Sequence, residues 1–154
     1  LERYGLRERA AEWMARLAGV TAGRVLGIYT LARGAAAALS LRLGGHVQFI
    51  RPLVYPMALG AARRRHGTLE PAEEERLKGL SAAVENYGNF FGQNLFVASA
   101  GVLLVVATLA ERKIAATPLA VSRAALPVAL MAGGLALAQC LLFDWRLRRG
   151  RKPR

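Results

Sequence analysis

The sequence is poor in the residues that build disulfides, metal clusters and acid catalysts. Cys140 is its single cysteine, which excludes an internal disulfide and any cysteine metal cluster, and Asp144 is its single aspartate. No phosphate-binding loop, dinucleotide-binding glycine motif, HExxH, GxSxG, CxxC or pair of catalytic carboxylates occurs. We therefore expect neither an enzyme nor a metal site.

Acidic residues are scarce as well, since 10 Asp and Glu oppose 22 Lys and Arg, for a formal net charge of +12. In a soluble protein such a charge would indicate nucleic-acid binding. Here the basic residues group at the ends of apolar segments, as the positive-inside rule predicts for membrane proteins, and 54% of all residues are hydrophobic. The composition favours a membrane protein of one domain over a basic nucleic-acid binder.

The chain begins at Leu1 rather than Met, without the apolar region of a signal peptide, so we expect an N-terminally truncated fragment. Residues 1–19 place apolar side chains at three- and four-residue spacing opposite arginines, which predicts an amphipathic helix. We expect this helix to lie in the membrane surface, with Trp13 at the level of the headgroups. A helix packed on a soluble core would show the same periodicity.

Residues 24–62 form two apolar arms around a polar tip. The second arm, 52–62, covers roughly 16 Å as a helix, about half of a hydrocarbon core of roughly 30 Å. If the first arm crossed fully, the basic cluster 63–65 would lie on the outer side, against the positive-inside tendency. We therefore predict a re-entrant helical hairpin whose tip lines a cavity enclosed by protein. The candidate binding residues at this tip are Gly44, Gly45, His46 and Gln48.

Three arginines of this hairpin, Arg33, Arg42 and Arg51, need partners or water if they lie in a membrane. Arg42 or Arg51 could contact an anion, or their long side chains could extend to the membrane interface. The hairpin is followed by 63–83, a basic cytoplasmic loop and an amphipathic arm helix. Glutamates 73–75 lie in the first turns of that helix, where they oppose the positive end of its dipole, so we interpret them as a solvated helix start rather than a metal site.

A polar stretch, ENYGNFFGQN at 85–94, runs directly into the uncharged apolar segment 95–110. An unpartnered carboxylate or amide in hydrocarbon costs roughly 2.5–3.5 kcal/mol or more, so such groups usually face a partner or a watery cavity. Gly88 and Gly92 each weaken a helix by about 1 kcal/mol and let its backbone open. We predict a broken transmembrane helix over 84–110. Transporters bind ions and substrates with such elements. The alternative is a frayed helix start among the lipid headgroups. The candidate binding residues of this stretch are Glu85, Asn86, Asn89, Gln93 and Asn94.

Residues 120–145 contain an uncharged run long enough to cross a membrane. Pro127 and the pair Gly133-Gly134 predict a kink or a close helix contact. Trp145 would mark the interface, and the basic tail 146–154 would keep the C-terminus in the cytoplasm. We therefore predict an all-α fold, a multi-pass membrane protein with an interfacial amphipathic helix, a re-entrant hairpin, a broken transmembrane helix and a C-terminal transmembrane helix.

Three strings carry a family resemblance: LERYGLRERAAEWMARL at 1–17, LGGHVQFIRPLVYPMALGAA at 43–62 and AVENYGNFFGQNLFVA at 83–98. They resemble the bacterial membrane family called domain of unknown function 969, whose members are often named as one subunit of a 5-oxoproline (pyroglutamate) transporter. The resemblance implies a bacterial inner-membrane location and further membrane segments before Leu1. It also implies a second membrane subunit, of the domain of unknown function 979 type.

That pair of families resembles the two halves of an ion transporter superfamily carrier, in which a hairpin tip and a broken helix hold sodium and an anionic substrate. By this resemblance the tip is 44–48, the broken helix is 86–94, and Pro56 matches a proline common in the outgoing arm. The chain departs from the superfamily at the tip, which lacks Ser-Asn-Thr, and at the break, which lacks Gly-Thr-Pro-Pro-Asn.

We therefore expect one subunit of a secondary transporter for a small anionic metabolite such as 5-oxoproline, with sodium or a proton as coupling ion. The ligand would be held between the hairpin tip and the helix break, and Glu85 would bind the cation or carry the proton. A non-transporting membrane scaffold or regulatory subunit of a partner protein is the alternative.

Overall fold

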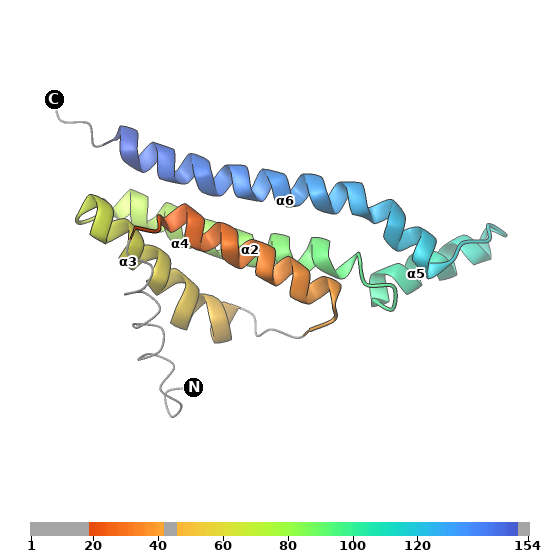
Figure 1. Ribbon diagram of the computed structural model, residues 1–154. Helices are drawn as coiled ribbons and strands as arrows, with labels where there is room; N and C mark the ends of the chain where they lie inside the picture. The colour runs from red at the N-terminus through yellow and green to blue at the C-terminus, as the bar shows by residue number, and fades with distance from the viewer. Residues whose placement is uncertain (1–18, 42–45, 151–154) are drawn as a thin grey trace.

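The computed structural model describes residues 19–41 and 46–150, and all regular structure within these ranges is helical (Figure 1). The elements in chain order are α2 (Ala22–Ala38), η2 (His46–Val54), α3 (Tyr55–His66), α4 (Pro71–Gln93), α5 (Ala100–Glu111) and α6 (Pro118–Arg149). The predicted all-α class is thus confirmed for the described residues. The predicted interfacial helix lies outside them except for its last residue, and so do Gly44 and Gly45 of the predicted tip.

Helices α2, α4 and α6 lie side by side and enclose most of the apolar core (Figure 1). Leu26 of α2, Leu77 and Val84 of α4 and Cys140 of α6 are fully buried where the three helices meet. Burial of a side chain of this size contributes roughly 1.5–3 kcal/mol. The three-helix core therefore fixes the positions of the polar side chains that α2 and α4 carry further along.

The first turn of α2 is tied to the end of α6 by Asp144. The Gly23 N–H donates to Asp144 Oδ1 over 2.9 Å, and the Asp144 side chain is buried, with 3% of its surface exposed. A Cβ added at Gly23 would lie 2.1 Å from the Cys140 carbonyl oxygen, so only glycine permits this approach. The carboxylate satisfies an N–H that no helical carbonyl can reach and opposes the positive end of the α2 dipole.

After α2 the chain turns back as η2 and α3, giving two helical arms joined by a loop that begins near Ser40, where φ is 59°. The arms pack against each other, and the second arm also packs on α4. η2 is a π-helix, wider than an α-helix, and contains Pro52. Because a proline ring in an α-helix clashes with the carbonyl four residues earlier, the wider turn accommodates Pro52.

Helix α4 begins at Pro71, behind a capping box formed by Glu70 and Glu73. Glu73 and Glu74 lie in its first turn, where the dipole favours negative charge. The arginines at 63–65, at the end of α3, and those in the last turn of α6 lie at the same end of the bundle as the start of α4 (Figure 1). We call this end, which gathers the two arginine clusters, the basic end, and helix α5 lies at the opposite end.

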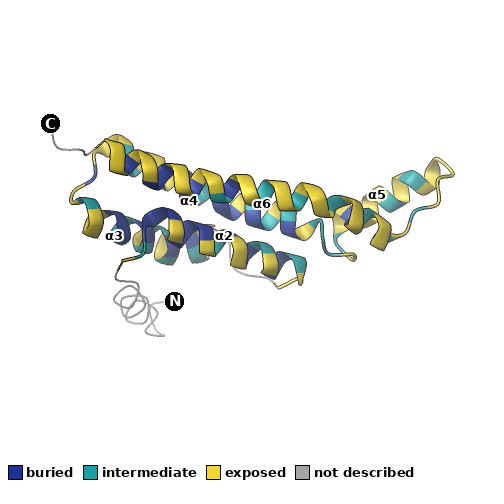
Figure 2. Cartoon of the chain, turned by 45° about the horizontal axis from the view of Figure 1, so that its top comes forward, coloured by how far each residue is buried: buried dark blue, intermediate teal, exposed yellow. Residues whose placement is uncertain are grey.

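Helix α6 is, within the described residues, the one helix long and apolar enough to cross a membrane. It stays helical through Pro127 and bends in its N-terminal part (Figure 1). Gly133 and Gly134 form no close helix contact inside the described chain, because a Cβ added at either would meet no described atom within 4 Å. Most of α6 and α5 is exposed (Figure 2), including many large apolar side chains.

Candidate functional site

The glycines of the polar stretch serve helix packing rather than helix breaking. A Cβ added at Gly92 would lie 2.4 Å from the Gly34 carbonyl oxygen of α2, and one at Gly88 would lie 2.9 Å from the Arg33 side chain. α4 therefore remains helical through Gln93, and the non-helical segment before α5 is 94–99. The structure thus places the interruption at 94–99, at the end of the predicted segment 86–94 and within the range 84–110 predicted for the broken helix, because the two glycines let α4 lie directly against α2.

This close approach brings a buried ion pair together. Arg33 Nε lies 3.0 Å from Glu85 Oε1, and only 7% and 5% of the two side chains are exposed. The Tyr29 hydroxyl donates to the other carboxylate oxygen of Glu85. Each charge alone would be costly in this position, so the pair is held by mutual compensation and by the added hydrogen bond.

The hydrogen bonds continue from the ion pair along α4. Arg33 Nη2 donates to Asn89 Oδ1 over 2.5 Å, and Gln93 Nε2 donates to the same oxygen over 2.9 Å. Glu85, Asn89 and Gln93 are spaced four residues apart, so they share one face of the helix. The result is a polar row that runs from the buried ion pair to the exposed end of α4.

The row opens into a hollow of about 520 Å³ next to the interrupted segment. Arg33, Asn89 and Gln93 line one side, and Ser40 and Ser99 are among the residues that line the rest. The Ser99 hydroxyl caps α5 by accepting the Val102 N–H over 3.2 Å, so α5 begins at the hollow and its positive dipole end borders it. A guanidinium, two amides, two hydroxyls and a helix N-terminus together are suited to a small anion.

The structure brings three of the predicted site residues together and leaves the others apart. Glu85, Asn89 and Gln93 belong to the polar row; Asn86 is exposed on another face of α4, and Asn94 is the residue after its last turn. Gln48 is exposed in η2, while His46 begins η2 with its side chain outside the description. Of the segment leading to the predicted tip, Ser40 and Leu41 line the hollow.

Arg33 and Tyr29 are the members of this cluster that sequence reasoning did not select. The sequence indicates that Arg33 needs a partner and that Glu85 is a lone carboxylate entering an apolar segment. Pairing the two unmatched charges is the signal that could have found the contact, although 52 residues separate them.

A second polar cluster lies at the basic end, between the hairpin and the start of α4. The Tyr55 hydroxyl donates to Glu74 Oε1 over 2.9 Å, and Arg63 Nη2 donates to Glu74 Oε2 over 3.1 Å. The hydrogen bond from Tyr55, aided by the Arg63 charge, lowers the pKa of Glu74. Because the Arg63 and Glu74 side chains are 52% and 27% exposed, water screens this pair far more than the Arg33–Glu85 pair.

Comparison with known proteins identifies the family of the chain. Residues 1–148 match a family model described as "Protein of unknown function (DUF969)". No curated protein and no solved structure matches the chain. Since the match covers nearly all 154 residues, the chain belongs to the DUF969 family.

Proposed function

We propose that the chain is one subunit of a secondary membrane transporter for a small anionic metabolite, with 5-oxoproline as the first candidate. The observation that carries the proposal is Arg33, a buried guanidinium that lines a polar hollow between the start of the hairpin loop and the interrupted helix. Carriers commonly bind anions where a helix is interrupted and backbone N–H groups face the ligand. Arg33, Asn89, Gln93 and the start of α5 would hold the anion.

The membrane placement is supported by the exposed apolar surface of α5 and α6. Large exposed side chains on these two helices include Leu103, Leu104, Leu126, Leu130, Met131 and Leu135. Soluble monomers rarely leave a contiguous apolar surface of this kind uncovered. In our proposal α6 crosses the bacterial inner membrane, and α4 and α5 form a broken membrane helix of a multi-pass protein.

The orientation follows from the basic end of the bundle. Arginines at 63–65 and at the end of α6 would lie in the cytoplasm under the positive-inside rule, which puts the C-terminus inside. The two arms α2 and η2–α3 would then enter and leave on the cytoplasmic side, as a re-entrant hairpin. Their polar loop would lie at membrane depth only because surrounding protein covers it.

The buried ion pair would couple binding of the anion to binding of a cation, through charge neutrality. Arg33 and Glu85 are neutral as a pair, so an anion that binds Arg33 adds one uncompensated negative charge to a poorly hydrated site. A proton on Glu85, or a sodium ion beside it, restores neutrality. Glu85 is therefore the coupling residue in this proposal, and Tyr29 and Asn89 position it and Arg33.

A partner subunit would supply the rest of the transport pathway. The hollow is open on one side, and the apolar surfaces of α5 and α6 have no cover within the described chain. A second membrane subunit, of the domain of unknown function 979 type, would cover them.

A non-transporting scaffold is the second candidate, favoured by one observation. Tyr29, Arg33, Glu85, Asn89 and Gln93 satisfy one another's hydrogen bonds, as a structural network would. The scaffold predicts that replacing Asn89 changes stability and nothing else. The transporter predicts that the same replacement changes uptake of the anion at unchanged protein level.

The experiment is uptake of labelled 5-oxoproline into proteoliposomes that hold this chain with its partner. We expect Asn89→Ala and Gln93→Ala to reduce uptake at least tenfold, which corresponds to about 1.4 kcal/mol of lost ligand interaction. Arg112→Gln, an exposed arginine at the end of α5 and away from the hollow, is the matched control and should transport normally. Normal uptake by both hollow variants would remove the site assignment, and no uptake by the unaltered pair of subunits would favour the scaffold.

A further inference from the structure

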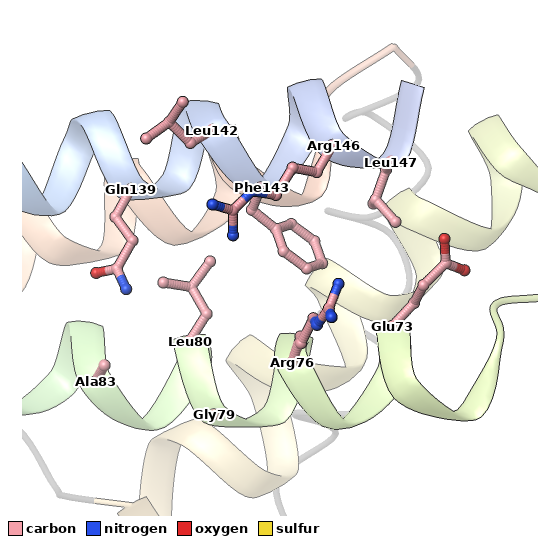
Figure 3. A pocket seen from close by; sticks show the side chains of 10 residues that line it. All are labelled: Glu73, Arg76, Gly79, Leu80, Ala83, Gln139, Leu142, Phe143, Arg146 and Leu147. Atoms are coloured by element: carbon pink, nitrogen blue, oxygen red, sulfur yellow. The ribbon is translucent and has the colours of Figure 1, made fainter. Parts of the chain in front are cut away.

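A second hollow lies between α4 and α6 at the basic end of the bundle. Its volume is about 360 Å³, and Leu80, Phe143 and Leu147 supply buried apolar lining. Arg76 of α4 and Arg146 of α6 also line it, and their guanidinium groups lie in the gap between the two helices on either side of the Phe143 ring (Figure 3). The hollow therefore combines an apolar floor with two cations from different helices.

No ion pair is recorded for the side chains of these two cations in the part of the chain that the structure describes. Neither the Arg76 nor the Arg146 guanidinium takes part in a hydrogen bond or ion pair among the described residues. Glu73 is the one carboxylate among the lining residues, and it also accepts the Glu70 N–H over 2.9 Å in the capping box, so its single negative charge offsets at most one of the two cations. Two like charges that face one cavity repel each other unless an anion enters between them.

The position along α6 indicates where that anion comes from. Trp145, exposed on the same turns of α6, lies 4.0 Å beneath the guanidinium carbon of Arg149, an arrangement typical of the membrane interface. From the hollow toward the middle of α6, the exposed Leu135 and Leu142, seven residues apart and so on one face of the helix, continue the apolar lining. Headgroup-level cations above an apolar strip match the two parts of a phospholipid.

We infer that this hollow binds an anionic phospholipid, with the phosphate between Arg76 and Arg146 and an acyl chain along the apolar strip of α6. Phosphate oxygens accept from two guanidinium groups at once, and the acyl chain fits the apolar lining that a soluble anion would leave empty. The site is separate from the hollow at Arg33. The inference rests on the membrane placement of α6, and it holds whether or not the chain transports anything.

The test is a lipid titration of the full chain in uncharged detergent, followed by native mass spectrometry. We expect phosphatidylglycerol to bind more tightly than phosphatidylcholine, and Arg76→Gln/Arg146→Gln to weaken phosphatidylglycerol binding about thirtyfold, from about 1 kcal/mol for each basic side chain. Binding of phosphatidylcholine should weaken much less, because its choline cation offsets the charge of its phosphate. The matched control is Arg64→Gln/Arg65→Gln, which removes two exposed charges at the same end of the bundle and should keep phosphatidylglycerol affinity within about twofold.

Three outcomes would overturn the inference. Equal losses in the two double variants would show diffuse attraction between a basic surface and an acidic lipid. Unchanged binding in Arg76→Gln/Arg146→Gln would show that the hollow is not the site. Displacement of the lipid by inorganic phosphate at equal concentration would show a site for small anions in which the acyl chain has no part. Both double variants change exposed side chains only, and circular dichroism verifies that they retain the helical fold.

Discussion

The contact between α2 and α4 and the pair formed by α5 and α6 at the other end of the bundle are built in opposite ways. In the first, glycines bring two backbones together and the buried polar side chains find partners: Thr30 and Ser81 donate to carbonyls of their own helices, and Arg33 pairs with Glu85. In the second, Ser122 is buried with no partner among the described residues, and large apolar side chains are exposed. The polar groups of the first region are satisfied within the chain, whereas the second region exposes apolar side chains that no described residue covers.

The α2–α4 contact therefore stabilises the fold itself, whereas the surfaces of α5 and α6 determine how the fold sits in a membrane or against a partner. Replacements at the α2–α4 contact should act on stability in any environment, because the interactions are internal. Replacements on α5 and α6 should act mainly on membrane insertion or partner binding. Variants at the two regions can therefore test the comparison directly.

The largest effect is expected for Glu85→Gln, which leaves the Arg33 guanidinium buried without its countercharge. Removing one partner of a buried ion pair costs about 3–5 kcal/mol, so the midpoint of thermal unfolding should fall steeply. The companion variant Arg33→Leu/Glu85→Leu removes both charges and should regain most of that loss. A double variant as unstable as Glu85→Gln would show that the pair contributes through shape rather than charge.

A loss of about 2.5–3.5 kcal/mol in membrane insertion is expected for Leu130→Arg, which places a charge near the middle of α6. Leu130 is exposed, so the internal contacts of the bundle should remain intact. The measurement is the fraction of chains inserted into microsomes, with Leu126→Ile as the uncharged control. A Leu130→Arg chain that is released into water and stays folded there would contradict the membrane placement of α6.

A smaller effect is expected for a single methyl group added at the α2–α4 contact. Gly92→Ala puts a Cβ against the Gly34 backbone, and overpacking of this kind costs about 1–3 kcal/mol. Gly133→Ala is the matched change on α6, where no described atom lies within 4 Å, and it should gain up to about 1 kcal/mol from helix propensity. Thermal unfolding of the two variants should therefore shift in opposite directions, and shifts of equal sign would refute the contrast.

The smallest effect is expected for Glu74→Gln, which breaks the exposed contacts with Tyr55 and Arg63. The pKa of Glu74 is lowered in the folded chain, so its contribution is present above the ordinary range of glutamate and disappears as the pH falls through the lowered pKa. The variant should differ slightly from the unaltered chain at neutral pH, and the difference should vanish in acid. A difference that persists at low pH would assign the effect to packing.

The sequence predicts those elements that are determined by neighbouring residues in the chain. The apolar run within α6 is visible as composition, and the start of α4 follows from a proline and acidic residues that suit its first turn. The all-helical class follows from the same patterns. None of these requires knowledge of what the helix touches.

The position of the helix interruption could not be predicted in this way. Gly88 and Gly92 weaken a helix when their own sequence is considered alone, but each is placed against α2, whose residues lie more than fifty positions earlier. The contact with α2 keeps them helical, so the chain leaves the helix only after Gln93. Likewise, the sequence shows that Arg33 and Glu85 each need a partner. Only the packing of α2 on α4 shows that the two residues pair with each other.

The contact between Asp144 and Gly23 has a practical consequence for shortened versions of the chain. The first turn of α2 depends on a carboxylate supplied 121 residues later, close to the end of α6. A stop codon placed after Trp145 would retain that acceptor. One placed before Asp144 would leave the buried Gly23 N–H without an acceptor and expose Gly23 to the surroundings. Affinity tags and fusion partners therefore belong beyond Gly150, where the last turn of α6 has already closed.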